Sequence, residues 1–287
     1  METLTELQYG QVEMVEQDDY TTKLFVDFQN SKLKLIKYTG DLIKVISNTI
    51  DMCGKYGLGK IIATVHEGDH QAFLNNGFVQ EAVIEGYFKG SIGYNVSYFY
   101  DRERAISHRI SEEDKIIEMA KEYEEPYKPL ENSRFSIRTA TIEDADAMAN
   151  LYDEVFKTYP TPMHDAEYIK DVILNDEVFF KVVEFDHQII SAASADMNHE
   201  LLNAEMTDCA TLQEFRGKGL LGELVYHLEA SLKEKKFMTL FSIARAISPG
   251  INIVFSKHGY HYVGRQINNS NIMGTLEDMN IWVKRIN

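Results

Sequence analysis

Apolar residues recur at helical spacing after a glycine-containing loop in the last third of the chain, and this stretch organises the rest of the pattern. Residues 203–212 read as a short strand, and residues 213–219 form a tight loop that carries Arg216 and Lys218. One apolar stripe then continues at helical spacing, formed by Leu220, Leu221, Leu224, Val225, Leu228 and Leu232. We therefore predict a strand that turns through the loop into the N-terminus of a helix.

The pattern of residues 134–287 predicts strands and helices in the order β-α-α-β-β-β-α-β-α-β-β. Thr141 and Asp144 give the first of these helices a capping-box-like start. The expected strands are 135–138, 178–185, 188–197, 203–212, 237–243, 260–267 and 277–285. The expected helices are 141–156, 165–174, 220–232 and 250–258.

The first half of the chain has a similar pattern. The expected strands are 24–28, 33–37, 60–65, 79–88 and 94–100, and the expected helices are 42–53, 69–77 and 101–123. Asp69 is the expected N-cap of the short middle helix. Residues 124–129 contain two prolines and separate the halves. We place an N-terminal domain at residues 1–125, a linker at 126–133 and a second domain at 134–287.

Composition narrows the classes of function. A chain of 287 residues can form two domains with a sizeable core each. The formal net charge of −16 argues against a nucleic-acid partner and is compatible with a cationic small substrate. Cys53 and Cys209 form no metal-ligand pattern, so we expect a reducing cytoplasm, no disulfide and no metal. The sequence has no charged leader and no long uncharged apolar run, so we expect neither secretion nor a membrane span.

The loop at residues 213–219 has the chemistry of an anion site. The first amides of a helix lack intrahelical acceptors and carry partial positive charge, and glycine lets the backbone approach a phosphate. The leucines after Gly219 argue against a nucleotide triphosphatase loop. A dinucleotide-binding pattern is nominally present from Gly217 to Gly222, but several strands precede it and no acidic ribose ligand follows. A loop that merely connects two elements is the remaining alternative.

The run Arg216-Gly217-Lys218-Gly219-Leu220-Leu221 resembles the acyl-coenzyme A loop of the GNAT acetyltransferases, with Gly222 one position late. The element order of residues 134–287 is also similar to that family. The resemblance implies an α/β (α+β) GNAT fold and acetyl-coenzyme A as the acyl donor. The coenzyme-binding residues that it implies are Ala210, Thr211, Leu212, Arg216, Gly217, Lys218, Gly219, Leu220, Gly222, Ser248 and Phe255.

A second motif carries the same resemblance. Phe255-Ser256-Lys257-His258-Gly259-Tyr260 stands where GNAT enzymes have a helix that ends in Tyr-x-x-x-Gly-Phe near the thioester. Phe255 takes the place of a tyrosine that protonates the leaving thiolate in many members. Because phenylalanine has no proton to donate, we expect water or another group to protonate the thiolate. Ser248 takes the place of the polar residue that begins this helix.

The motif recurs in the first half as Phe73-Leu74-Asn75-Asn76-Gly77-Phe78, which indicates a degenerate copy of the fold. The corresponding loop, Thr39-Gly40-Asp41, has one glycine, no cation and a carboxylate at the helix start, so it would repel an anion. We expect this N-terminal domain to bind no coenzyme, and to pack against the second domain or shape its substrate cleft.

The whole chain resembles a narrower family, the β-lysine N-acetyltransferases, which acetylate the terminal amine of β-lysine. The runs that carry this resemblance are 159–164, 205–211, 268–274 and 277–282. The family implies a lysine 2,3-aminomutase that supplies β-lysine, and a product that serves as a compatible solute or an intermediate of lysine metabolism. A homodimer is a further expectation.

The chemistry of amine acylation singles out the strand before the loop. An ammonium must lose a proton before it attacks a thioester, and the developing oxyanion needs a hydrogen-bond donor. We expect Glu205 to act as the base or hold a water, and Asp208 to bind the substrate ammonium. A regular strand would point them to opposite faces, so a bulge is required. Solvent-facing positions are the alternative. The expected substrate-binding residues are Tyr159, Asn269, Asn271 and Asn280.

Two classes of function stay open at this point. The first is acetyl transfer to a small amine, with β-lysine the leading acceptor and an antibiotic amine, a polyamine or a protein lysine as rivals. The second is a non-catalytic acyl-coenzyme A-binding module, which Phe255 favours and the acidic pair disfavours. Cys209 is a candidate nucleophile, but a small buried strand residue is the simpler interpretation.

Overall fold

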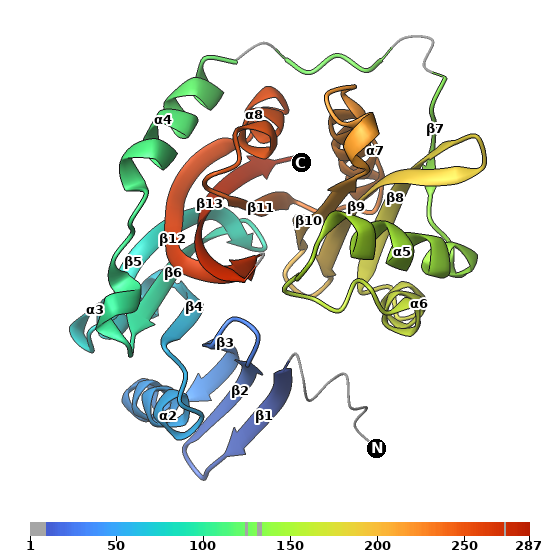
Figure 1. The fold of residues 1–287 in the computed structure, drawn as a ribbon. Coiled ribbons are helices and arrows are strands. Elements are labelled where there is room, and N and C mark those ends of the chain that lie inside the picture. Colours follow the sequence, from blue (N-terminus) through green and yellow to red (C-terminus); the bar gives the residue numbers. More distant parts are fainter. Residues whose placement is uncertain (1–9, 124–125, 131–133, 273) are drawn as a thin grey trace.

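A computed structural model describes residues 10–123, 126–130, 134–272 and 274–287 (Figure 1). Within these residues, thirteen strands form one sheet in the order β1-β2-β3-β4-β6-β5-β12-β13-β11-β10-β9-β8-β7. The strands are β1 (Gly10–Glu16), β2 (Tyr20–Asp27), β3 (Lys32–Gly40), β4 (Lys60–His66), β5 (Val79–Phe88), β6 (Ser91–Phe99), β7 (Ser136–Thr139), β8 (Val178–Phe185), β9 (Gln188–Asn198), β10 (Asn203–Thr211), β11 (Thr239–Arg245), β12 (His261–Ile272) and β13 (Thr275–Arg285). The α-helices are α2 (Leu42–Lys55), α3 (Glu67–Asn75), α4 (Ile110–Lys121), α5 (Ala145–Val155), α6 (Ala166–Leu174), α7 (Leu220–Glu234) and α8 (Pro249–Lys257).

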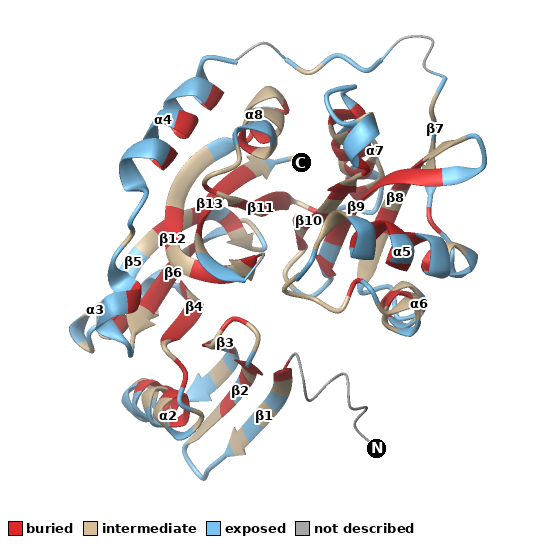
Figure 2. Cartoon of the chain, viewed as in Figure 1, coloured by how far each residue is buried: buried red, intermediate tan, exposed pale blue. Residues whose placement is uncertain are grey.

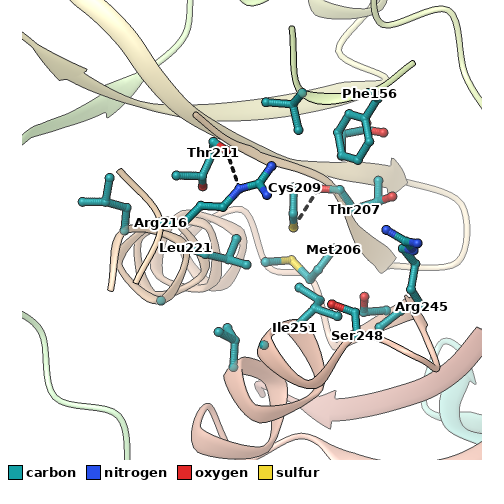
Figure 3. Close-up of a pocket in the computed structure, with 18 of the residues that line it drawn as sticks. Phe156, Met206, Thr207, Cys209, Thr211, Arg216, Leu221, Arg245, Ser248 and Ile251 are labelled. Atoms are coloured by element: carbon teal, nitrogen blue, oxygen red, sulfur yellow. Dashed lines mark hydrogen bonds between the residues drawn. The ribbon is translucent and has the colours of Figure 1, made fainter. Parts of the chain in front are cut away.

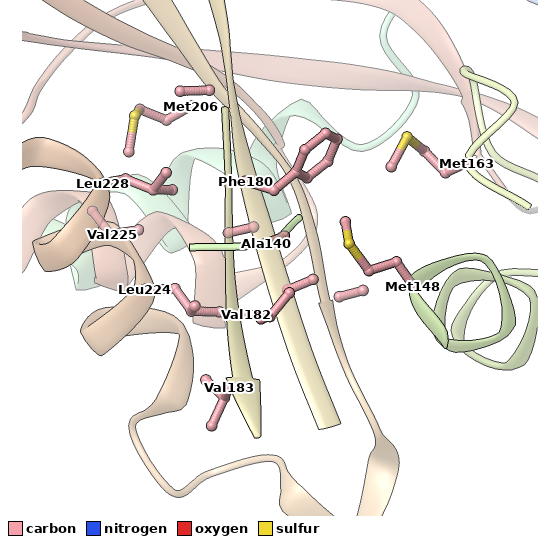
Figure 4. Packing of buried hydrophobic residues seen from close by; sticks show 14 of the residues in the cluster. Ala140, Met148, Met163, Phe180, Val182, Val183, Met206, Leu224, Val225 and Leu228 are labelled. Atoms are coloured by element: carbon pink, nitrogen blue, oxygen red, sulfur yellow. The ribbon is translucent and has the colours of Figure 1, made fainter. Parts of the chain in front are cut away.

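Helices cover both faces of the sheet in the C-terminal half, which we define as the described residues after 133. Residues 189–195 of β9 are buried without interruption, as expected of a strand that is covered on both faces (Figure 2). The helices α5 and α7 both pack on this strand. The apolar core lies between these layers, and Met148, Phe180 and Leu224 are among its buried side chains (Figure 4).

The N-terminal half, residues 10–123, repeats the strand order of the C-terminal half. Strands β2-β3-β4-β6-β5 match β9-β10-β11-β13-β12 in order and direction, and α2 and α3 take the places of α7 and α8. Residues 10–123 contain no counterpart of β7, α5 and α6. This half is therefore a shortened copy of the other, as the repeated motif predicted.

The two halves join through one antiparallel pairing, β5 with β12, at Ala82 and Gly264. A Cβ at Gly264 would lie 2.0 Å from the Glu81 carbonyl oxygen, so glycine is required for the strands to approach. Beside this contact Lys60 forms a buried ion pair with Glu81 at 2.9 Å, and Lys60 Nζ donates to the Ile267 carbonyl at 2.8 Å. Burial lowers the pKa of Lys60 to about 8, although Glu81 favours the charged form. Hydrogen bonds therefore connect the two halves at a buried seam.

The structure departs from the expected elements in three places. The helix expected over 101–123 is shorter, because Arg102–Ala105 form a separate 3-10 turn and α4 begins only at Ile110. Strand β1 was not expected because it is an edge strand whose apolar Val12 and Met14 are more than half exposed, so it lacks a buried face. The expected N-cap of the short helix is wrong, because α3 begins at Glu67 with His66 as its N-cap. Asp69 instead accepts a hydrogen bond from the Tyr38 hydroxyl at 2.7 Å. Among the described residues, no helix is long and apolar enough to cross a membrane.

Residues 126–130 of the predicted linker pass over α7 and α8. The Tyr127 N–H donates to the Lys257 carbonyl at 3.0 Å, and the Tyr127 hydroxyl donates to Glu223 at 2.5 Å. Residues 124–125 and 131–133 lie outside the described part of the chain. The division of the chain into domains at 126–133 therefore stays a prediction.

Candidate active site

A cleft opens in the sheet where β10 and β11 diverge. The two strands pair in parallel only between residues 203–205 and 239–241. Past this point a cavity of about 540 Å³ lies between β10, β11, α7 and α8 (Figure 3). We call it the loop cavity. Its lining includes Thr207, Cys209, Thr211, Leu221, Ser248 and Ile251.

The loop before α7 presents backbone amides to this cavity. Gly217 and Gly219 have φ angles of 74° and 79°, which favour glycine. Gly219 is the N-cap of α7, and no described side chain caps the amides of the first turn. Arg216 Nε donates to the Thr211 carbonyl at 3.1 Å, and the Lys218 ammonium donates to a backbone carbonyl of the same loop. The loop therefore has the geometry and charge of an anion site.

Helix α8 forms the opposite wall of the loop cavity. Ser248 is its N-cap, as predicted, and lines the cavity together with Ile251 and Val254. Phe255 is fully buried in the core instead, where its ring packs edge-on against Tyr260 with centroids 5.0 Å apart. The ring of Phe255 therefore contributes to packing and is turned away from the cavity.

The other predicted coenzyme-binding residues either line the loop cavity or are buried beside it. Those that line the loop cavity are Thr211, Arg216, Gly217, Gly219, Leu220 and Gly222. Ala210 and Leu212 are buried, and the Leu212 N–H already donates to the Ile190 carbonyl at 3.0 Å, so this amide does not support the expected coenzyme-binding role of Leu212. A Cβ at Gly222 would lie 2.5 Å from the Tyr127 ring, so this glycine is also needed for packing.

A second cavity, of about 1140 Å³, lies between the two halves of the molecule. We call it the large cavity. Strand β3 lines one side with Lys32 and Lys34, and β10 lines the other with Glu205. The residues that line both cavities are Tyr159, Thr207, Asp208, Ile243, Ile272 and Met279. The two cavities therefore meet beside Asp208.

The predicted bulge is present in β10. Its register with β9 shifts between Thr207 and Ala210, and Asp208 has a φ of 46°. Because the bulge adds a residue, Glu205 and Asp208 both line the large cavity. The Tyr152 hydroxyl donates to the Asp208 carbonyl at 2.5 Å and so holds the bulge in place.

The two carboxylates have different surroundings. Asp208 is buried and accepts a hydrogen bond from the Ser194 hydroxyl at 2.6 Å. Burial raises the pKa of Asp208, while hydrogen bonds from Ser194 and Tyr159 oppose the rise. Glu205 has no hydrogen bond or ion pair with another described residue. Burial and the nearby Asp208 raise the pKa of Glu205, and Lys34 opposes this shift. Unlike Asp208, Glu205 therefore has no hydrogen bond to a described residue that it would lose on accepting a proton.

Asp196 is a third carboxylate of the large cavity, and the sequence did not single it out. It stands directly opposite Glu205 in the β9–β10 ladder and lines the large cavity. Its side chain is exposed to the cavity, yet the surrounding protein and the charges of Asp208 and Glu205 raise its pKa. The available signal was a charged residue in a strand that is otherwise almost entirely buried.

The predicted substrate residues are only partly brought together. Tyr159 and Asn269 line the large cavity. Asn280 is fully buried, where it accepts a hydrogen bond from Arg265 at 2.8 Å and donates one to Asn252 at 2.9 Å. The Asn271 N–H donates to a side chain of the N-terminal half. Asn271 and Asn280 therefore lie in packed regions outside the lining of both cavities.

The remaining chemical candidates give no further site. Burial and Asp208 raise the pKa of the Cys209 thiol to about 12, so it is protonated at neutral pH and a poor nucleophile. The described residues contain no group of three or more His, Cys, Asp or Glu that could hold a metal ion.

Comparisons with known proteins bear on this arrangement. The model of the acetyltransferase (GNAT) family matches residues 145–248. A β-lysine N(6)-acetyltransferase of Methanococcus maripaludis is 32% identical over 256 residues, which cover 89% of this chain and 93% of the relative. The enzyme of the same name from Methanosarcina mazei is 34% identical over 256 residues, which cover 82% and 94%. The N-acetyltransferase YodP of Bacillus subtilis is 33% identical over 266 residues, which cover 93% and 96%. A solved N-acetyltransferase from Staphylococcus aureus is 18% identical, with a TM-score of 0.48, and covers 54% of this chain and all of its own.

Similarity at this level extends over nearly the whole length of the relatives and over most of this chain. The family uses acetyl-coenzyme A as its acyl donor. The chain therefore belongs to the GNAT acetyltransferase family, and it is an acetyl-coenzyme A-dependent N-acetyltransferase.

Proposed function

We propose that the protein transfers the acetyl group of acetyl-coenzyme A to the N6 amine of β-lysine. The observation that carries this proposal is the meeting of two cavities beside Asp208. One cavity has an anion-binding loop, and the other has carboxylates that suit a cationic amine. The two relatives named β-lysine N(6)-acetyltransferase support the choice of acceptor.

Acetyl-coenzyme A fits the loop cavity from the loop to the bulge. Its pyrophosphate would bind the first-turn amides of α7, with Arg216 and Lys218 adding charge. Its pantetheine arm would follow the free edge of β10, which has no β11 partner past Glu205. The thioester would then reach the junction of the two cavities, beside Thr207 and Asp208.

The acceptor amine enters from the large cavity as an ammonium, which Asp208 holds at the junction. Glu205 removes a proton, directly or through a water molecule, so that the nitrogen gains a free electron pair. The nitrogen attacks the thioester carbonyl and forms the C–N bond, while backbone amides of the bulge donate hydrogen bonds to the oxyanion. The C–S bond then breaks and releases the thiolate, and the nitrogen, which became positively charged on attack, gives up its second proton to water so that a neutral amide forms. Water or another group protonates the thiolate, because Phe255 has no proton to donate and is buried in the core.

The biological setting follows from the same proposal. β-Lysine would be supplied by a lysine 2,3-aminomutase, and the acetylated product would serve as a compatible solute or an intermediate of lysine metabolism. We propose the cytoplasm as the compartment and a homodimer as the assembly. Sedimentation of the purified protein measures the assembly directly.

A panel of acceptors tests the proposal. Release of free coenzyme A thiol is measured with β-lysine, α-lysine, spermidine, an aminoglycoside and a lysine-containing peptide. We expect the highest kcat/KM for β-lysine, and a product acetylated at N6 by NMR. Preference for the polyamine, the antibiotic or the peptide would overturn the assignment of the acceptor and leave the family unchanged.

A further inference from the structure

The large cavity combines charges of opposite sign from the two halves of the chain. Its C-terminal wall carries Asp196, Glu205 and Asp208, on β9 and β10. Its N-terminal wall carries Lys32 and Lys34, on β3. Because a polyamine has only positive charges, the lysines would repel it. An acceptor that carries both signs of charge fits these walls better.

The acidic wall forms no ion pair among the described residues, although the charge of Lys34 opposes the rise in the pKa of Asp196 and Glu205. Glu205 and Asp196 are directly opposite each other in the β9–β10 ladder, an arrangement in which like charges repel. Neither carboxylate has an ion pair or hydrogen bond with another described residue. Their pKa values are raised, and burial is the first cause for both. A bound ammonium would relieve this repulsion.

Lys34 is the matching unpaired cation. Its side chain is exposed to the large cavity and forms no ion pair within the described residues. The two lysines on either side along β3 are engaged. Lys32 is buried and donates to the Asn269 carbonyl at 3.1 Å, and Lys37 is paired with Glu200 at 3.0 Å.

The floor of the large cavity gives a further sign of a polar ligand. Asn269 lines this cavity, its side chain is 2% exposed, and its Oδ1 has no hydrogen-bond partner among the described residues. Leaving a buried polar atom without a partner costs free energy, and a polar ligand in the cavity would satisfy the Asn269 Oδ1. Asn269 therefore indicates that the cavity accepts a polar molecule.

We propose that Lys34 binds the carboxylate of the acceptor and that Asp196 binds its non-reacting ammonium. This inference rests on the proposed function and adds to it the residues that recognise the carboxylate and the second amine of a diamino acid. The order along β10 suits such a molecule. Glu205, which stands opposite Asp196, lines only the large cavity. Further along β10, Thr207 and Asp208 line both cavities, and Cys209 lines only the loop cavity. The charged head would lie between Asp196 and Lys34, and the far amine would reach the thioester.

The proposal gives the N-terminal half a role in specificity. We do not expect that half to bind an anion at its own helix start, because the Asp41 carboxylate already accepts hydrogen bonds from the Ile43 and Lys44 amides. It contributes Lys34 from β3, the strand that corresponds to β10 in the other half. The shortened copy thus supplies the positive wall of the acceptor cavity.

Three acceptors separate the two contacts. β-Lysine carries all groups, its carboxamide lacks the negative charge, and 6-aminohexanoate lacks the second amine. In the wild type we expect kcat/KM to be highest for β-lysine. Lys34→Met should lower kcat/KM for β-lysine by about 10–100-fold and for the amide by much less, because a charge-assisted hydrogen bond is lost. Asp196→Asn should lower kcat/KM for β-lysine and leave 6-aminohexanoate within a few-fold.

Lys37→Met is the matched control, because it removes the same charge from the same strand outside the cavity. It should change neither the ratio of kcat/KM for β-lysine and its carboxamide nor the ratio for β-lysine and 6-aminohexanoate. Lys34→Arg should restore part of the preference for the acid, and thermal unfolding checks that every variant is folded. An unchanged acid-to-amide ratio in Lys34→Met would overturn the carboxylate contact. If the wild type prefers another amino acid to β-lysine, the proposed function fails. The role of Lys34 is then tested in the same way, by comparing kcat/KM for that amino acid and for its amide in Lys34→Met. Preference for a diamine without a carboxylate would overturn both.

Discussion

Replacement of Glu205 by glutamine tests the proposed catalytic base most directly. Glutamine keeps the shape of the side chain and removes its basicity. In the structure Glu205 faces the large cavity, and no described residue forms a hydrogen bond or ion pair with it. We therefore expect Glu205→Gln to lower kcat and to leave the affinity for acetyl-coenzyme A intact, since Glu205 lies outside the loop cavity.

The size of the effect follows from the proton balance of the amine. A lysine-type amine has a pKa of about 10.4, so only about one molecule in 10³ is neutral near pH 7.4. A variant without the base must draw on this small fraction, and we expect kcat to fall by about 10²–10⁴-fold. Its rate should then rise with pH until the amine titrates near pH 10.

The pH profile of the wild type gives a second signature. Burial and Asp208 raise the pKa of Glu205 above its ordinary value of 4.5. Glu205 accepts a proton only when it is ionised, so the wild-type rate should fall as pH drops through this raised pKa. The acid limb should therefore lie at a higher pH than that of an ordinary glutamate, and it should be absent from Glu205→Gln.

The assay is steady-state thiol release from about pH 5 to pH 10, with coenzyme affinity measured by calorimetry. Glu177→Gln is the matched control, because it removes the same charge from an exposed position on the lining of the large cavity. If Glu205→Gln stays within a few-fold of the wild type at every pH, Glu205 is not the base. Tyr159, Glu277 and bound water would then be the groups to examine.

Three further predictions use other parts of the molecule. Joint replacement of Arg216 and Lys218 by glutamine should raise the coenzyme dissociation constant substantially and in a salt-dependent way, and an unchanged value in calorimetry would remove the anion-loop assignment. Titration should give one coenzyme per chain, because Asp41 caps α2 where Gly219 leaves α7 open, and a stoichiometry of two would contradict this. Lys60→Met should lower the free energy of unfolding by about 3–5 kcal/mol in urea, because it leaves a buried carboxylate unpaired, and a change below 1 kcal/mol would refute that role.

Features that depend on neighbours in the chain could be predicted from the sequence. Gly217 and Gly219 predict positive φ angles, and the apolar stripe that follows predicts a helix, so the glycine-containing loop before α7 was recognisable without tertiary contacts. The requirement for a bulge also followed locally, because Glu205 and Asp208 cannot share a face of a regular strand. The repeated motif indicated the shortened copy in the same way.

Features that depend on distant pairings appeared only in the tertiary structure. The register of β9 with β10 sets Asp196 opposite Glu205, and the sheet that joins the halves brings Lys34 to the same cavity from more than 160 residues away in sequence. Leu212 was expected to bind the coenzyme, but its amide donates to a carbonyl of β9 instead. Phe255 occupies a motif position near the thioester, yet core packing turns its ring inward. Spacing along a strand or helix fixes which face a residue occupies, whereas what stands opposite that face depends on strands paired across the whole chain.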